Sequence, residues 1–345
     1  MGYGVAESGR KFVAIWLYLI AALVLSMVLL GGVTRLTGSG LSMVDWRPIM
    51  GSIPPLNEQA WMETFEKYKQ YPQYQEVNKG MSLSDFKFIF GMEFAHRLLG
   101  RLLGLAFALP FLFFLFKKWL GPPMIRRGTL LFFLGGMQGV IGWYMVKSGL
   151  VDKPLVSQYR LTLHLSLATL VYALSLWYAF SLTLVNEKKG TISKLRIQTL
   201  VLLLLVCIQV MSGGFVAGLH AGFAFNTFPT MNGQWIPEGM LAISPVIFNL
   251  FDNPVTVQFF HRCMAYLITV VVLVYYFRNR KTWATSTVPM AIHLLPLFLA
   301  VQVGLGITTL LMRVPVVLGS LHQIGAIVLL TVVLFLTHRV THIED

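Results

Sequence analysis

The chain has 345 residues, of which 56% are hydrophobic and only 12% are charged. An average soluble domain is about one-quarter charged, so this composition excludes an ordinary soluble enzyme. The 13% of aromatic residues excludes a disordered chain. The formal net charge of +13 is typical either of a nucleic-acid-binding protein or of basic loops beside a membrane.

Eight apolar runs are long enough to cross a bilayer, which takes about 20 helical residues. In chain order they lie at about 13–33, 89–116, 128–146, 160–184, 197–217, 257–277, 287–311 and 317–337. Backbone groups in lipid must be paired within their own segment, so each run is predicted to be a helix. The predicted fold class is therefore an all-α integral membrane protein with eight transmembrane helices.

Lysine and arginine concentrate in alternate loops of this predicted topology. The loops on the side of the two termini are short and basic, whereas the segment at about 218–256 contains neither residue type. Basic loops stay in the cytoplasm, so both termini are predicted to be cytoplasmic, in a bacterial inner membrane. The positive charge is thereby explained without a nucleic-acid partner.

The sequence repeats itself in two halves. The segment Glu93-Phe-Ala-His96-Arg97 matches Gln258-Phe-Phe-His261-Arg262. Further matches pair Gly31-Gly32 with Gly213-Gly214, Gln138-x-x-x-Gly142 with Gln302-x-x-x-Gly306, and the surroundings of His164 with those of His322. Four spans per half give both halves one orientation, which predicts two tandem pseudo-symmetric four-helix bundles, residues 1–185 and 186–345, related by an axis along the membrane normal. The inner linker is expected at about 185–196.

Four histidines occur at matching depths, His96, His164, His261 and His322. Ionisable residues inside a membrane are costly, and they are functional candidates by default. Each half contains two, and facing imidazoles in a bundle core suit the two axial positions of a haem iron. Any one of them alone could be a polar residue hydrogen-bonded across helices, but four in register with the repeat favour haem.

The two halves differ at one position beside these histidines. Glu93 lies three residues before His96, on the same helix face, whereas Gln258 precedes His261. A carboxylate can act as an acid or base, whereas an amide only hydrogen-bonds. This difference predicts a reactive N-terminal half and a C-terminal half that holds a cofactor. The alternative is that Glu93 is a surface carboxylate near the helix entry, where acids are favoured.

Several other polar residues are weaker candidates. Arg97 and Arg262 either pair with haem propionates or extend to lipid headgroups; Arg35 and Arg47 are lesser candidates for the same propionates. His220 could line a haem edge. The remaining histidines are expected to be structural or solvated: His293, near the inner end of the seventh span, and His338 and His342, in the cytoplasmic tail.

Taken together, these segments resemble the haem A synthase family, in the branch shared by mitochondria and many proteobacteria. The resemblance covers nearly the whole chain. It rests on residues 31–42 (GGVTRLTGSGLS), the Glu93-x-x-His96-Arg97 segment, Asn226-Thr-Phe-Pro229, Met231-Asn-Gly233 and the His261-Arg262 and His322-Gln323 segments.

The resemblance implies oxidation of the methyl at ring position 8 of haem O to a formyl group. Two hydroxylations would give a geminal diol that loses water, and the product, haem A, serves cytochrome c oxidase assembly. By the same resemblance, His96 and His164 ligate the substrate haem, with Glu93 at the reacting side. His261 and His322 ligate a haem B cofactor, with Arg262 beside it. Expected partners are haem O, the farnesyltransferase that forms it, an electron donor and the lipid membrane; a homo-oligomer is compatible with the sequence.

The chain departs from some family members in one respect. Those members carry a cysteine pair in an outer loop, proposed for a redox relay, whereas Cys207 and Cys263 lie in apolar runs, so a thiol relay is not expected. The main alternative function is a di-haem electron-transfer cytochrome, which needs the same four histidines but changes no haem. A transporter built on parallel repeats would need charged or broken segments in mid-membrane, and the charges are expected at the outer rim instead.

Overall fold

The structure is a computed structural model that describes residues 4–45, 51, 53–150, 154–184, 187–188 and 193–344. Within these residues, eight helices are long and apolar enough to cross a membrane. They are α1 (Glu7–Leu36), α3 (Leu83–Phe116), α4 (Pro122–Gly149), α5 (Gln158–Thr183), α6 (Arg196–Gly218), α8 (Pro254–Trp283), α9 (Ala291–Leu311) and α10 (Val316–Thr341). All eight predicted spans are confirmed. The chain is a multi-pass α-helical membrane protein.

The helices extend past the apolar runs because polar residues cap them. At the start of α3, the Ser82 side chain accepts a hydrogen bond from the Asp85 backbone N–H, and the Asp85 side chain accepts one from the Ser82 backbone N–H. This capping box starts the helix at Leu83, before the expected position near residue 89. In α8, Pro254 takes the first helical position, and the side chain of Asn253 caps the backbone N–H of Val255.

Short elements lie between the long helices. They are α2 (Glu58–Tyr68), the π-helix η2 (Gln73–Val77), the 3-10 helices η3 (Ser193–Leu195), η4 (Ala221–Phe223) and η5 (Val246–Phe248), and α7 (Asn249–Asp252). β1 (Glu187–Lys188) pairs in parallel with β2 (Ile343–Glu344). The predicted linker thus meets the C-terminal segment, although residues 185–186 and 189–192 of it lie outside the described residues, as does Arg47.

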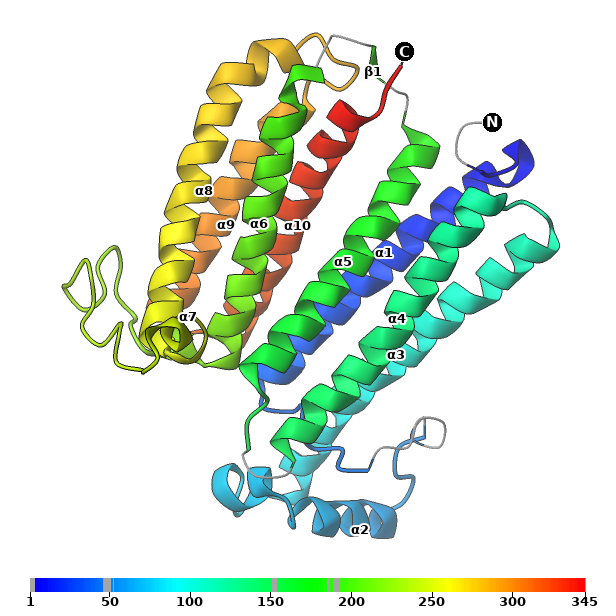
Figure 1. The fold of residues 1–345 in the computed structure, drawn as a ribbon. Helices are drawn as coiled ribbons and strands as arrows, with labels where there is room; N and C mark the ends of the chain where they lie inside the picture. The colour runs from blue at the N-terminus through cyan, green and yellow to red at the C-terminus, as the bar shows by residue number, and fades with distance from the viewer. Residues whose placement is uncertain are drawn as a thin grey trace.

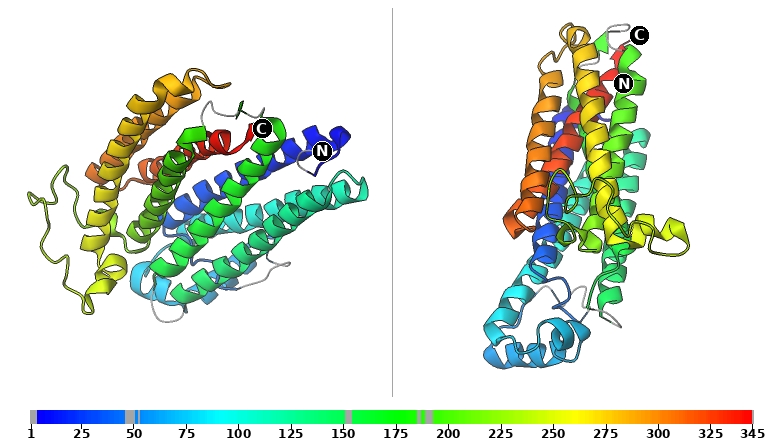
Figure 2. Two further views of the ribbon diagram at one scale, coloured as in Figure 1. Left: turned by 45° about the horizontal axis from the view of Figure 1, so that its top comes forward. Right: turned by 90° about the vertical axis from the view of Figure 1, so that its left-hand side faces the viewer.

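The long helices form two groups with separate apolar cores. One core is built mainly from α1, α3, α4 and α5 and includes Trp16, Phe107 and Leu176. The other is built from α6, α8, α9 and α10 and includes Trp283 and Leu330. Figures 1 and 2 show these groups side by side, with both chain ends at the same end of the helices. The pseudo-twofold axis between them stays a prediction.

The two groups meet where small residues permit close approach. A β-carbon on Gly214 of α6 would lie 2.9 Å from the hydroxyl oxygen of Thr162 in α5. Gly32 of α1 likewise receives the side chain of Gln323 from α10, whose amide nitrogen donates to the Val28 carbonyl at 2.9 Å. Contacts between α1 and α10 and between α5 and α6 therefore join the groups.

The end of the helices opposite the termini, here called the loop end, carries α2 and the segment 219–253 (Figure 1). Beside the first helix group, α2 packs on the start of α3 through a small aromatic cluster that includes Phe65, Tyr68, Phe86 and Phe90. This cluster holds the long first loop against α3. It thereby fixes the neighbourhood of Glu93.

Candidate functional site

The four predicted histidines lie on α3, α5, α8 and α10, near the loop end. His164, His261 and His322 follow the first residue of their helices by six, seven and six positions. His96 follows the first residue of α3 by 13 positions, because α3 starts further out. All four side chains are partly exposed in the chain, so each borders open space.

Each histidine ring lies against a glycine of the preceding long helix. The pairs are His96 with Gly31, His164 with Gly142, His261 with Gly213, and His322 with Gly306, and a β-carbon on the glycine would lie 3.2, 3.1, 3.4 and 2.8 Å from the nearest ring atom. A β-carbon on Gly31, Gly142 or Gly306 would press on the ring, whereas one on Gly213 would make ordinary van der Waals contact. The glycines therefore set where the imidazoles sit.

The histidines form two pairs, one in each helix group. His96 lies near His164 in the first group, and His261 lies near His322 in the second, close enough for each pair to interact. Among the described residues there is no cluster of three or more His, Cys, Asp or Glu side chains that could hold a metal ion. Two imidazoles without further protein ligands suit a haem, because the porphyrin supplies the other four nitrogens.

The space beside the first pair also suits a flat ligand. In α3 and α4, β-carbons on Gly104, Gly135 and Gly139 would have no atom within 4 Å outside their own helix. In the sequence these small residues are compatible with close helix approach or with room for a flat ligand, and the open space at the three positions favours the second interpretation. The donor set and the open space together fit a haem in the first helix group.

In three of the four histidines, the backbone carbonyl accepts a hydrogen bond from a glutamine side chain. The side-chain amide of Gln138 donates to the His164 carbonyl at 3.0 Å, and Gln302 donates to the His322 carbonyl at 2.9 Å. The sequence repeat had matched these two glutamines. It had missed Gln209, which donates to the His261 carbonyl at 3.1 Å and has the same spacing of four residues to its glycine.

The contacts of His261 also bear on its protonation. The Ser212 hydroxyl donates to the Gln209 carbonyl at 2.9 Å and lies 2.7 Å from Nδ1 of His261. A hydroxyl has one hydrogen to donate, so when it is directed at the Gln209 carbonyl the oxygen can accept the proton of Nδ1. In that tautomer Nε2 of His261 keeps the lone pair that a metal ligand needs.

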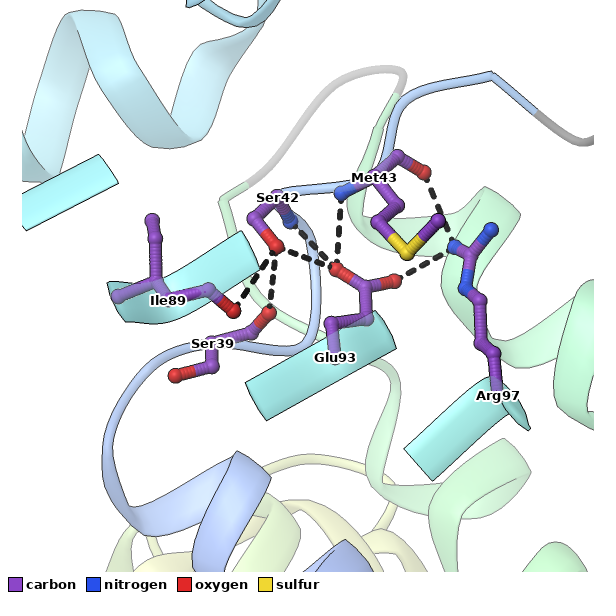
Figure 3. A network of polar contacts seen from close by, with 6 residues as sticks. All are labelled: Ser39, Ser42, Met43, Ile89, Glu93 and Arg97. Carbon is purple, nitrogen blue, oxygen red and sulfur yellow. Dashed lines mark hydrogen bonds and ion pairs between the residues drawn. The ribbon is translucent and has the colours of Figure 1, made fainter. Parts of the chain in front are cut away.

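Glu93 is buried, with 2% of its surface exposed, and both of its carboxylate oxygens accept hydrogen bonds (Figure 3). Its Oε2 accepts hydrogen bonds from the Ser42 backbone N–H at 2.7 Å, the Ser42 hydroxyl at 2.7 Å and the Met43 backbone N–H at 2.8 Å. Its Oε1 accepts from Arg97 at 2.5 Å. All four contacts are donors, as suits a carboxylate without a proton. The alternative that Glu93 is a surface carboxylate near the helix entry is wrong.

Arg97 joins this network and does not extend toward headgroups in the structure. Beyond Glu93, its Nη2 donates to the Met43 carbonyl at 2.9 Å. Glu93 and Arg97 are four residues apart, so they share one face of α3. Together they hold the segment that follows α1 against the helix that carries His96.

The matching residues of α8 hold the other long loop. Gln258 donates to the Phe225 carbonyl at 3.0 Å. Arg262 donates to the same carbonyl at 3.0 Å and to that of Thr227 at 2.9 Å. The residues at these four positions thus occupy corresponding places, but among the described residues Glu93 and Arg97 form an ion pair, whereas Gln258 and Arg262 both donate to backbone carbonyls.

Two further arginines bear on the sequence analysis. Arg35 donates to the Ala217 carbonyl at the end of α6 and so bridges the two helix groups. Arg101 lies in α3 one turn beyond Arg97 and is partly buried. The expectation that charges stay at the outer rim overlooked it, although an arginine inside an apolar run is itself a signal.

The weaker histidines are also placed. His220 is exposed after α6, with the left-handed backbone angle φ of 52°, and the Nδ1 of His293 lies 3.0 Å from the Tyr276 hydroxyl. His338 belongs to α10 and is 1% exposed, so its expected place in a solvated tail is wrong and the structural alternative holds. His342 follows α10, and its ring stacks on the ring of His338 with the two centroids 4.0 Å apart.

Comparisons with known proteins agree with these features. The family model COX15-CtaA, described as "Cytochrome oxidase assembly protein", matches residues 14–334. The chain is 49% identical to "Heme A synthase" of Nitrosospira multiformis, over 96% of this chain and 94% of that protein. It is 46% identical to "Heme A synthase" of Nitrosomonas eutropha, over 95% and 94%. It is also 46% identical to "Heme A synthase COX15" of Arabidopsis thaliana, over 95% and 74%. The chain therefore belongs to the COX15-CtaA family of cytochrome oxidase assembly proteins.

Proposed function

We propose that the chain is an enzyme of haem A synthesis that oxidises the ring-8 methyl of haem O to a formyl group, for cytochrome c oxidase assembly. The names of its relatives support haem A synthesis. The observation that carries the proposal is the presence of two similar histidine pairs, only one of which has a buried carboxylate beside it. A redox cytochrome has no need of that difference.

We assign the substrate haem to the first helix group. His96 and His164 would hold haem O there, and haem A after the reaction. His261 and His322 would hold a haem B, with Arg262 at its edge. When bound, haem B supplies the redox chemistry; the chain's own residues position the substrate and limit the access of water to it.

The hydrogen bonds of Glu93 bear on its role in this proposal. A base must have a lone pair directed at the proton it takes. Oε2 of Glu93 accepts three hydrogen bonds, whereas Oε1 accepts one, from Arg97, and keeps a second lone pair. We propose an electrostatic role, because these donors hold the carboxylate in place, where it can stabilise positive charge that develops at the methyl carbon.

The membrane setting completes the proposal. Both termini lie at one end of the helices (Figure 1), and basic loops on that side favour a cytoplasmic location in a bacterial inner membrane. Haem O would arrive from the farnesyltransferase that forms it, and an electron donor would serve haem B. We infer no nucleic-acid partner.

Analysis of the extracted haems tests this function. The full chain is purified from a host that makes haem O, and its haems are separated by chromatography and weighed by mass spectrometry. Haem B together with haem O, its hydroxylated form or haem A is the expected result. Two haem B per chain with no modified haem would overturn the proposal in favour of a di-haem electron-transfer cytochrome.

A further inference from the structure

His261, the first histidine of the second helix group, is contacted by two polar side chains of α6. The Gln209 amide nitrogen donates to the His261 carbonyl and lies 3.3 Å from both ring nitrogens. The Ser212 hydroxyl lies 2.7 Å from Nδ1 and 2.9 Å from the Gln209 carbonyl. These contacts hold the ring in position.

The register between α1 and α6 identifies the corresponding residues of the first group. Gly31 lies against the ring of His96 just as Gly213 lies against the ring of His261. Four residues before Gly31 stands Met27, in the place of Gln209. One residue before Gly31 stands Leu30, in the place of Ser212.

The side chain of Met27 in α1 is directed at the part of α3 that carries His96. Its methyl carbon would lie 3.6 Å from a β-carbon on Gly100, one turn along α3 from His96. A thioether and an alkyl group have no hydrogen to donate, and leucine cannot accept one. Among the described residues, no side chain hydrogen-bonds to the ring or the carbonyl of His96.

We propose that Met27 and Leu30 make His96 the exchangeable ligand of the protein, whereas Gln209 and Ser212 make His261 a permanent one. This inference rests on the proposed function, in which the first group must release haem A and the second must keep haem B. An imidazole without hydrogen bonds can rotate off an iron at lower cost than one held at its carbonyl and at Nδ1. Met27 and Leu30 are thus positioning residues that act through His96.

Exchanging these residues between the groups tests the inference. One variant of the full chain carries Met27→Gln and Leu30→Ser, and its matched control carries Met27→Leu and Leu30→Val, which add no hydrogen bond. A reverse variant carries Gln209→Met and Ser212→Ala. Each protein is loaded in a host that makes haem O and then mixed with excess apomyoglobin, which takes up released haem. Chromatography identifies which haem has left.

The expected result is opposite in the two groups. The first variant should release the farnesylated haem about thirtyfold more slowly, which corresponds to about 2 kcal/mol for its two added hydrogen bonds, whereas the control should match the unmodified chain. The reverse variant should release haem B faster by a similar factor. After reduction, the share of haem that binds carbon monoxide, which needs a vacated axial position, should change in the same directions.

The outcomes separate this inference from the proposed function. If the chain keeps haem B and a farnesylated haem but no exchange changes either release rate, the inference fails and the function stands. If the unmodified chain keeps no farnesylated haem, the function fails and the inference falls with it. Should the double variant not fold, Met27→Gln alone must slow release relative to Met27→Leu, and equal rates would overturn the inference.

Discussion

The two helix groups hold their loops with residues at matching positions but of opposite hydrogen-bonding character. In the first group, Glu93 accepts hydrogen bonds from the backbone N–H groups of Ser42 and Met43. In the second, Gln258 donates to the carbonyl of Phe225. At this position, one loop therefore presents backbone donors to its helix and the other presents an acceptor.

This comparison changes the meaning of the difference between Glu93 and Gln258. From the sequence alone, the carboxylate suggested acid-base chemistry. In the structure the carboxylate also matches the loop that covers it, and an amide at the same place would direct a donor at other donors. Glu93 and Gln258 thus each hold a loop by hydrogen bonds that match its backbone groups. Any role of Glu93 in the reaction is additional to this structural one.

Replacing a histidine of one pair should have the largest effect, which is the loss of one of the two haems. His261→Ala should abolish the retained haem B and leave the farnesylated haem, because His261 and His322 form a pair apart from the first group. His96→Ala should show the converse loss. Haem content and the absorption spectrum of the purified proteins measure both. Loss of both haems in each variant would mean that the groups are not independent sites.

The Glu93 network should give the next largest effect. Glu93→Gln removes the negative charge that pairs with the partly buried Arg97 guanidinium, a change of the kind that costs about 3–5 kcal/mol, and it directs the new amide hydrogens toward the donors of residues 42 and 43. We expect a lower thermal midpoint and loss of turnover together. Ser42→Ala is the milder control, since it removes one donor of about 1 kcal/mol and keeps the ion pair.

Comparing the two variants distinguishes a role of Glu93 in holding the loop from a role in the reaction. If Ser42→Ala keeps turnover while Glu93→Gln loses it with an unchanged thermal midpoint, the carboxylate acts on the substrate and hardly on the loop. If both variants lose stability and turnover in proportion, the loop is what matters. Normal haem A production by Glu93→Gln would remove Glu93 from the reaction altogether.

The eight helices and the four histidines could be predicted because their signals are local. Apolar runs report membrane spans directly, and the repeated His-Arg segments report corresponding positions. The partners of Glu93 could not be predicted, because two of them are backbone N–H groups about fifty residues away along the chain, and backbone donors have no sequence signature. Gln209 could have been found, since Gln-x-x-x-Gly occurs there as it does at Gln138 and Gln302.

The glycines beside the histidines should give a graded, smaller effect. A β-carbon would lie 2.8 Å from Cε1 of His322 at Gly306, 3.1 Å from Cε1 of His164 at Gly142, and 3.4 Å from Cε1 of His261 at Gly213. Alanine at Gly306 must displace the ring, whereas alanine at Gly213 makes ordinary contact. We therefore expect the low-spin haem absorption to weaken in the order Gly306→Ala, Gly142→Ala, Gly213→Ala. An equal response at Gly213 and Gly306 would contradict the packing.

The smallest expected effect lies at the end of the helices that carries the termini. Burial lowers the pKa of His342, and Arg127 and Arg339 act in the same direction, against the hydrogen bond to the His338 carbonyl, which raises it. The unfolded chain then takes up the proton first, near the ordinary histidine pKa of about 6.5. The free energy of unfolding should therefore fall as the pH drops below about 6.5 and be level above it.

His342→Gln tests this because glutamine keeps a polar side chain without a titrating group. The thermal midpoint in detergent, measured at pH 5.5 and pH 7.5, should differ less in the variant than in the unmodified chain, by a small amount since His342 is partly exposed. The two proteins should agree at the higher pH, where the imidazole is neutral in both the folded and the unfolded chain. An unchanged acid response would place the sensitivity in a group other than His342.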